Sequence, residues 1–341
     1  MPRVLVATLV ALIISIVAGP KFIEFLRRNE FGQQIREEGP RHHVVKQGTP
    51  VMGGLLIVIS AIVAFLLLSH FTWPALIVLF VTVACAAIGA TDDVMKIANS
   101  RSLGLTARWK MALLVAITAV VGLLVHHYHL GHERQLFIPF ADRWLDLSWG
   151  WYVFLFLIVA GFANGVNLTD GLDGLAAGTG IIALFTYTGM SVMAFIRSSP
   201  GAASGRDVTK LDLAILGAAL IGGAVGFLWF NAFPAEVFMG DTGSMALGGA
   251  LAGFAVITKT ELLLLLIGGI FVVEAASVML QVATFKYWGR RIFLMTPIHH
   301  HFEMKAWSET KIMVRFWIVT AILAAAGFAL YYAYYLPPRN R

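Results

Sequence analysis

The segment NGVNLTDGLDGL, residues 164–175, carries four amide or carboxylate side chains at every third position: Asn164, Asn167, Asp170 and Asp173. On a helical path, residues three apart form one stripe that drifts slowly around the axis, so these side chains could act together. Asn and Asp are also common helix caps, but a cap needs only one such residue. The spacing therefore indicates that these four side chains act together, in addition to any capping of a helix.

Three further acids lie at the ends of apolar runs. Asp92 and Asp93 are adjacent, and Asp241 lies in the glycine-rich stretch FMGDTGS, residues 238–244. Adjacent side chains on a helix point in different directions, so we expect Asp92 and Asp93 to have different roles. The stretch around Asp241 could bind phosphate through its backbone N–H groups, or Asp241 could be a simple N-cap. Clustered carboxylates repel one another unless a cation lies between them, and Mg²⁺ prefers carboxylate and phosphate oxygens.

Three consecutive histidines, His299, His300 and His301, lie in PIHHHFE, residues 297–303. Consecutive imidazoles in a regular element cannot all bind one ion, which disfavours a zinc site. A cationic loop precedes them, so we expect them to donate hydrogen bonds to phosphate or sugar oxygens. Glu274 lies within an apolar run, where an acid usually faces the bundle interior or water, and this leaves a proton-coupled transporter as an alternative function.

The elements that must position these residues are membrane helices. The chain of 341 residues is 59% hydrophobic and 13% charged, whereas a soluble domain is about 45–50% apolar. About ten apolar runs are long enough to approach or span a hydrocarbon layer; they cover residues 4–19, 51–69, 74–91, 107–127, 149–163, 175–196, 211–230, 245–257, 261–285 and 312–335. Lipid cannot satisfy exposed backbone groups, so the runs must be helices. The sequence predicts an all-α integral membrane protein, with residues 1–341 in one domain.

The distribution of basic residues predicts the orientation of this bundle. Lys and Arg are concentrated in the loops after the first, third and ninth runs, and positively charged loops stay on the cytoplasmic side. Both termini are then expected on the outer side. The chemically suggestive groups fall in loops near residues 92–106, 164–174, 231–244 and 286–311, which are all expected on the cytoplasmic side with the basic loop near 21–50.

Four stretches together resemble the polyprenyl-phosphate N-acetylhexosamine-1-phosphate transferase superfamily. They are TDDVMK (91–96), NGVNLTDGLDGL (164–175), NAFPAEVFMGDTGS (231–244) and MTPIHHHFE (295–303). The PIHHHFE form and the early segment RHHVVKQGTPVMGG (41–54) are most similar to the phospho-N-acetylmuramoyl-pentapeptide transferases. The resemblance extends from about residue 31 to residue 315, and the motifs follow the order of the family.

This resemblance implies that the protein transfers phospho-MurNAc-pentapeptide from UDP-MurNAc-pentapeptide to undecaprenyl phosphate, which gives lipid I and UMP in peptidoglycan biosynthesis. It implies Mg²⁺ as cofactor, a bacterial inner (cytoplasmic) membrane as location, a homodimer, and no nucleic acid as partner. Phosphoryl transfer between two anions depends mainly on positioning and charge neutralisation, in agreement with the acidic and basic residues above. A sister transferase that moves another N-acetylhexosamine-1-phosphate is the nearest alternative.

The resemblance also implies roles for individual residues. Asp92 is the expected base on the lipid phosphate, with Asp93 beside it, and Asp241 is the expected Mg²⁺ ligand. In a two-step alternative, Asp241 is instead a nucleophile that forms a phospho-enzyme. The nucleotide is expected to contact Asn164, Asn167, Asp170, Asp173, with Asp173 toward uracil, and Asn231. The phosphates or the sugar-peptide end are expected to contact Lys46, Thr49, His299, His300 and His301.

Overall fold

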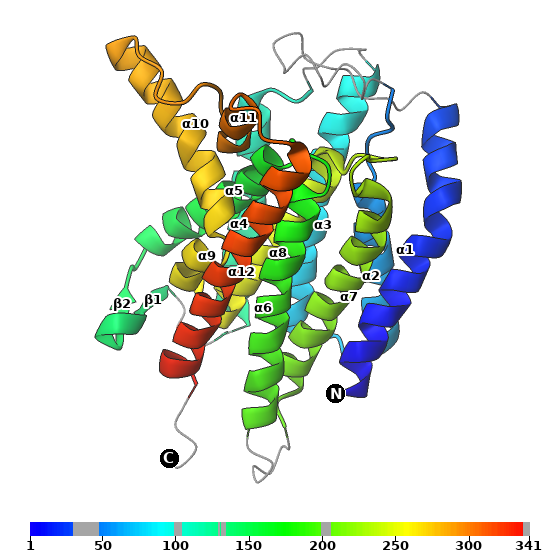
Figure 1. The fold of residues 1–341 in the computed structure, drawn as a ribbon. Helices are drawn as coiled ribbons and strands as arrows, with labels where there is room; N and C mark the ends of the chain where they lie inside the picture. The colour runs from blue at the N-terminus through cyan, green and yellow to red at the C-terminus, as the bar shows by residue number, and fades with distance from the viewer. Residues whose placement is uncertain (30–47, 99–103, 129, 131–133, 199–205, 337–341) are drawn as a thin grey trace.

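The computed structural model describes residues 1–29, 48–98, 104–128, 130, 134–198 and 206–336. These residues form a bundle of helices with one small pair of strands (Figure 1). The helices are α1 Pro2–Arg28, α2 Gly54–Leu68, α3 Trp73–Ala98, α4 Ala107–His127, α5 Gly150–Thr169, α6 Leu175–Arg197, α7 Val208–Asn231, α8 Gly240–Thr258, α9 Glu261–Ile267, α10 Gly269–Trp288, α11 Ile298–Glu303 and α12 Glu309–Tyr334.

Most of these helices are long and apolar enough to cross a membrane. Within the described residues, eight helices meet that description (α1, α3, α4, α5, α6, α7, α10 and α12), and α2 is a shorter apolar helix. Large apolar side chains remain exposed on their outer surfaces, for example Phe185 at 70% and Leu123 at 65%. Such surfaces are suited to lipid, which replaces water around a membrane bundle. The predicted all-α membrane fold is confirmed.

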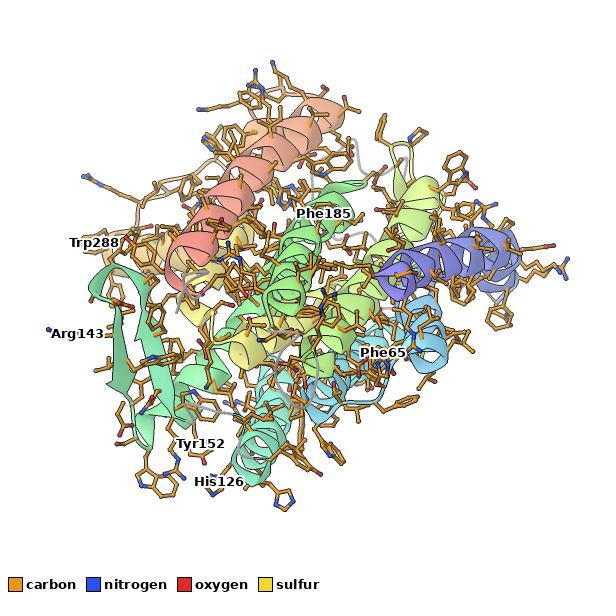
Figure 2. The ribbon with its side chains drawn as sticks, turned by 90° about the horizontal axis from the view of Figure 1, so that it is seen from below. Phe65, His126, Arg143, Tyr152, Phe185 and Trp288 are labelled. Atoms are coloured by element: carbon orange, nitrogen blue, oxygen red, sulfur yellow. The ribbon has the colours of Figure 1, made fainter. Side chains whose placement is uncertain are left out.

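Three features differ from the sequence prediction. The run 261–285 is not one helix, because α9 ends at Ile267 and α10 begins at Gly269. Helix α8 begins at Gly240, which places Asp241 in its first turn rather than in a loop before it. Strands β1 Gln135–Ile138 and β2 Arg143–Asp146 form an antiparallel pair that was not predicted, and this pair lies at the rim of the bundle (Figure 2).

Helix α8 lies at the centre of the bundle, since every residue from Thr242 to Val256 is buried. It packs closely on α3 because small residues line the contact, as is common between membrane helices. A Cβ atom added to Gly89 of α3 would lie 2.1 Å from the carbonyl oxygen of Asp241. Only glycine allows this approach, which brings the last turns of α3 next to the first turn of α8.

The two ends of the bundle differ in what they carry. The start of α1 and the end of α12 lie at the same end, as an even number of crossings requires, and α11 lies at the other end (Figure 1). The end that carries α11 also holds the start of α12 and the end of α5. The acids, amides and histidines of the sequence motifs therefore belong to helix ends and loops on one side of the bundle.

Candidate functional site

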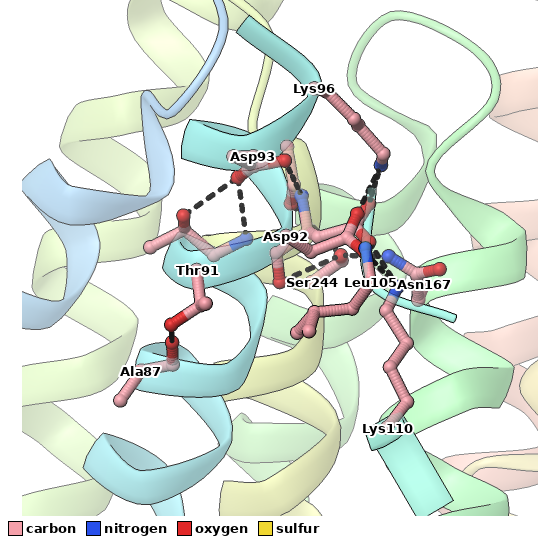
Figure 3. Close-up of polar contacts among 12 residues, drawn as sticks. Ala87, Thr91, Asp92, Asp93, Lys96, Leu105, Lys110, Asn167 and Ser244 are labelled. Atoms are coloured by element: carbon pink, nitrogen blue, oxygen red, sulfur yellow. Dashed lines mark hydrogen bonds and ion pairs between the residues drawn. The ribbon is translucent and has the colours of Figure 1, made fainter. Parts of the chain in front are cut away.

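Three acids that are far apart in the sequence lie together where α3 meets α8. Asp92, Asp93 and Asp241 each have a carboxylate oxygen within 4.8 Å of the others, and Figure 3 shows the surroundings of Asp92 and Asp93. The residues Asp92 and Asp93 are 1% and 2% exposed, whereas the Asp241 side chain is 14% exposed. We refer to these residues as the three-acid cluster. Of the three, Asp241 is the most accessible to a ligand.

Asp93 holds the start of α8 in place. One of its carboxylate oxygens accepts from the backbone N–H of Asp241 at 3.0 Å, and the other accepts from the N–H and the hydroxyl of Thr242 at 2.9 and 2.7 Å. The first N–H groups of a helix lack partners within the helix and favour a negative charge nearby. Asp93 therefore positions Asp241, and both of its oxygens are already engaged in doing so.

Two lysines, Lys96 and Lys110, each pair with both Asp92 and Asp241, and Figure 3 shows their ammonium groups next to Asp92. The Lys96 ammonium is 2.6 Å from Asp92 Oδ2 and 3.1 Å from Asp241 Oδ1. The Lys110 ammonium is 3.2 Å from Asp92 Oδ1 and 2.6 Å from Asp241 Oδ2. The backbone N–H of Leu105 also donates to Asp92 Oδ1, at 2.7 Å. The lysines neutralise much of the repulsion between the two carboxylates, and they could also bind an anionic phosphate.

The donor set of this cluster suits a hard divalent cation. Carboxylate oxygens are preferred ligands of Mg²⁺, which usually binds one or two of them and completes its coordination with water or substrate oxygens. With three carboxylates and two ammonium groups, the cluster has a formal net charge of −1. Asp241 and Asp92 fit the role of ligands best, because the oxygens of Asp93 are engaged by the start of α8.

The NGVNLTDGLDGL segment joins this cluster from the end of α5. Asn167 donates to the Ser244 hydroxyl at 3.0 Å, one turn into α8, while Asn164 donates to Ala160 of its own helix at 2.7 Å. Burial, together with the nearby charges of Asp241 and Asp93, raises the pKa of Asp170 to about 8. Asp170 therefore lies within electrostatic range of the cluster and binds a proton more tightly than an ordinary carboxyl.

Two predicted nucleotide contacts are engaged with neighbouring backbone. Asp173 is 4% exposed and accepts from the Ala235 N–H at 3.0 Å. Asn231 is 2% exposed, accepts from the Gly174 N–H at 3.0 Å and donates to the Val237 carbonyl at 2.9 Å. Through these bonds the loop after α5 and the loop after α7 form one unit beside the site.

The three histidines have different surroundings. His299 is fully buried, and its Nδ1 is 3.1 Å from Glu274 Oε1. His300 pairs with Glu303 in the same short helix, and His301 accepts from the Leu294 N–H at 3.1 Å. Substrate contact by these residues remains a prediction, and the side chain of His299 has no exposed surface in this conformation.

Lys46 lies outside the described residues, and Thr49 is half-buried next to Pro50, whose carbonyl accepts from the Phe238 N–H at 2.8 Å. The sequence predicted no site role for Lys96 or Lys110, and it singled out Glu274 only for the transporter alternative, not as a partner of His299. Asp92 and Lys96 are four residues apart in one helix, and this spacing could have indicated their ion pair. The pairs that Lys110 and Glu274 form depend on contacts between different helices.

Two comparisons with known proteins cover most of the chain. Residues 75–259 match the family described as glycosyl transferase family 4. The phospho-N-acetylmuramoyl-pentapeptide-transferase of Rubrobacter xylanophilus is 43% identical over 335 residues, which cover 96% of this chain and 97% of the relative. The protein of that name in Frankia alni is 44% identical over 357 residues, with 100% of both chains covered. The one in Desulfotalea psychrophila is 47% identical over 332 residues, covering 95% of this chain and 91% of the relative.

Proposed function

The chain belongs to the phospho-N-acetylmuramoyl-pentapeptide-transferase family, and we propose that it carries out the reaction of this family at the three-acid cluster. The reaction moves phospho-MurNAc-pentapeptide from UDP-MurNAc-pentapeptide to undecaprenyl phosphate, with lipid I and UMP as products. The enzyme is a multi-pass protein of the bacterial cytoplasmic membrane. The observation that carries the proposed location is the pair of lysines that bridges Asp92 and Asp241.

The substrates explain why such a cluster is needed. An oxygen of the lipid phosphate attacks the phosphorus on the sugar side of the UDP-sugar diphosphate, and the bond from that phosphorus to UMP breaks. Both reactants are anions, so the site must neutralise charge and align the two phosphates. In our proposal, Lys96 and Lys110 contact phosphate oxygens, and Asp92 accepts the proton of the lipid phosphate.

Magnesium fits this site, and Asp241 is the residue we propose to hold it, with Asp92 next to it. When bound, the ion supplies positive charge to the diphosphate oxygens and stabilises UMP as a leaving group. Asp93 keeps Asp241 in place through the start of α8 and is not needed as a ligand. Mg²⁺ at Asp241 would take over contacts that the two lysines make in this structure.

The residues around the cluster are proposed to bind the nucleotide sugar from the cytoplasmic side. Asn164, Asn167 and Asp170 lie at the end of α5, and Asp173 and Asn231 fix the two loops beside them. The homodimer implied by the resemblance is also a proposal, which the molar mass of the purified protein in detergent would test.

One experiment addresses both the reaction and the cofactor. Purified protein is incubated with UDP-MurNAc-pentapeptide, and UMP release is measured with and without undecaprenyl phosphate and with and without Mg²⁺. Release that needs both additions supports transfer at a magnesium site, and release without the lipid supports the two-step path through Asp241. If UDP-GlcNAc replaces the pentapeptide nucleotide as the better donor, the substrate assignment is wrong.

A further inference from the structure

A buried acid and a buried histidine meet behind the proposed nucleotide site, and the reaction described above uses neither of them directly. Glu274 of α10 and His299 of α11 are both 0% exposed, and Glu274 Oε1 is 3.1 Å from His299 Nδ1. The ionised form of Glu274 can only accept, and with it the hydrogen of this bond lies on His299 Nδ1. This bond fixes the orientation of the ring, and it determines whether the second nitrogen, Nε2, donates or accepts.

The bond between Glu274 and His299 uses only one of the two polar atoms of each side chain. His299 Nε2 and Glu274 Oε2 are buried and, among the described residues, have no hydrogen-bond partner. A buried polar atom without a partner costs about 1–3 kcal/mol. The unpartnered atoms of the pair therefore reduce the stability of the fold. This cost points to a role for the His299 ring beyond holding the helices together.

The ring of His299 lies against the turn between Asp170 and Asp173. A Cβ atom added to Gly171 would lie 2.3 Å from His299 Nε2 and 2.9 Å from its Cε1. The next residue, Leu172, is buried with Ile270 of α10 and Ile312 of α12 in one apolar cluster. The turn is thus supported by the imidazole at Gly171 and by apolar packing at Leu172.

We propose that Glu274 is a positioning residue for the nucleotide site. It holds the His299 ring against Gly171 and so fixes the turn that carries Asp170 and Asp173. This inference rests on the proposed function of that turn in binding UDP-MurNAc-pentapeptide. Loss of the outer partner that orients a metal-bound imidazole commonly costs about 10- to 100-fold in affinity or activity, and we expect an effect of similar size for the His299 ring.

The test measures both KM values and kcat for UMP release with full-length variants. Glu274→Leu removes the acceptor and is expected to raise KM for UDP-MurNAc-pentapeptide about tenfold or more, with KM for undecaprenyl phosphate changed less than about twofold. Glu274→Gln keeps an oxygen that can accept from Nδ1–H, so it should recover most of the lost affinity. A purely structural role would not produce a KM change limited to the nucleotide or this recovery.

Glu261→Leu is the matched control for loss of a buried acid. Glu261 is 1% exposed in α9, just beyond the end of α8 opposite Asp241. We expect this variant to keep both KM values. Gly171→Ala provides an independent arm, because its Cβ would displace His299, whereas Gly161→Ala places a Cβ where nothing lies within 4 Å. Gly171→Ala should reproduce the nucleotide-specific rise in KM, and Gly161→Ala should not.

The proposal is overturned if Glu274→Leu leaves KM for the nucleotide unchanged, or raises both KM values equally. Should Glu274→Leu fail to fold, the comparison of Gly171→Ala with Gly161→Ala tests the proposal instead. An unchanged KM for the nucleotide in Gly171→Ala would then refute it. Failure of the proposed function would look different, because the unmodified protein would then release no UMP from UDP-MurNAc-pentapeptide with undecaprenyl phosphate and Mg²⁺ present.

Discussion

The substitution Asp241→Asn tests the site most directly. It keeps the size of the side chain and removes its charge, so the helix start held by Asp93 should survive. The formal net charge of the three-acid cluster changes from −1 to 0, and a divalent cation loses its most accessible carboxylate. The variant should therefore bind Mg²⁺ more weakly and turn over more slowly.

The size of the effect follows from the contacts of Asp241. Its oxygens lie 3.1 and 2.6 Å from the Lys96 and Lys110 ammonium groups, and the three side chains are 14%, 29% and 16% exposed, respectively. Charge pairs near a protein surface interact with about 4 kcal/mol at 4 Å, but both lysines keep Asp92 as a partner. The lost electrostatic stabilisation should lower kcat about 10²- to 10³-fold, or about 2.7–4 kcal/mol.

The assay is UMP release over a Mg²⁺ titration, with thermal unfolding as a check on folding. Asp207→Asn is the control, because Asp207 also pairs with a lysine, at 3.4 Å, but both side chains are 40% exposed at the start of α7. Exposed pairs contribute about 0–1 kcal/mol, so its turnover should match the unmodified protein. If Asp241→Asn keeps turnover within about tenfold at the same Mg²⁺ requirement, our assignment of the metal site is wrong.

Three other perturbations have defined outcomes. Because the folded-state pKa of Asp170 is raised to about 8, ionisation of this carboxyl opposes folding increasingly from about pH 4 to about pH 8. The advantage in Tm of Asp170→Asn over the unmodified protein, measured without Mg²⁺, should grow across that range and then stay constant. The same advantage at pH 5 and at pH 8 would contradict the raised pKa. Gly89→Ala should lower both Tm and turnover, since its Cβ would lie 2.1 Å from a backbone oxygen of α8 and overpacking costs about 1–3 kcal/mol; Gly161→Ala is its control in both assays. Asp212→Ala removes an acceptor of three hydrogen bonds, two of them from His70, and should lower Tm with kcat unchanged; a loss of kcat at constant Tm would show that this buried acid acts in the reaction.

The sequence alone determined that the chain is a helical membrane protein. Hydrophobicity and the need to satisfy backbone groups in lipid act on each segment locally, so the apolar runs could be assigned to helices without knowledge of their neighbours. The motifs around Asp92, Asp170, Asp241 and His299 also specified the family, which the full-length relatives confirm. The roles of the individual site residues remain predictions.

The tertiary structure decided which of these side chains meet. Adjacent Asp92 and Asp93 have separate partners because α3 crosses the first turn of α8 closely at Gly89, which puts Asp93 on backbone N–H groups and Asp92 between two lysines. The pairing of His299 with Glu274 depends on how α11 folds back on α10. Hydropathy and spacing report how one segment meets lipid, whereas these contacts depend on the distance and crossing of two helices, which no single segment encodes.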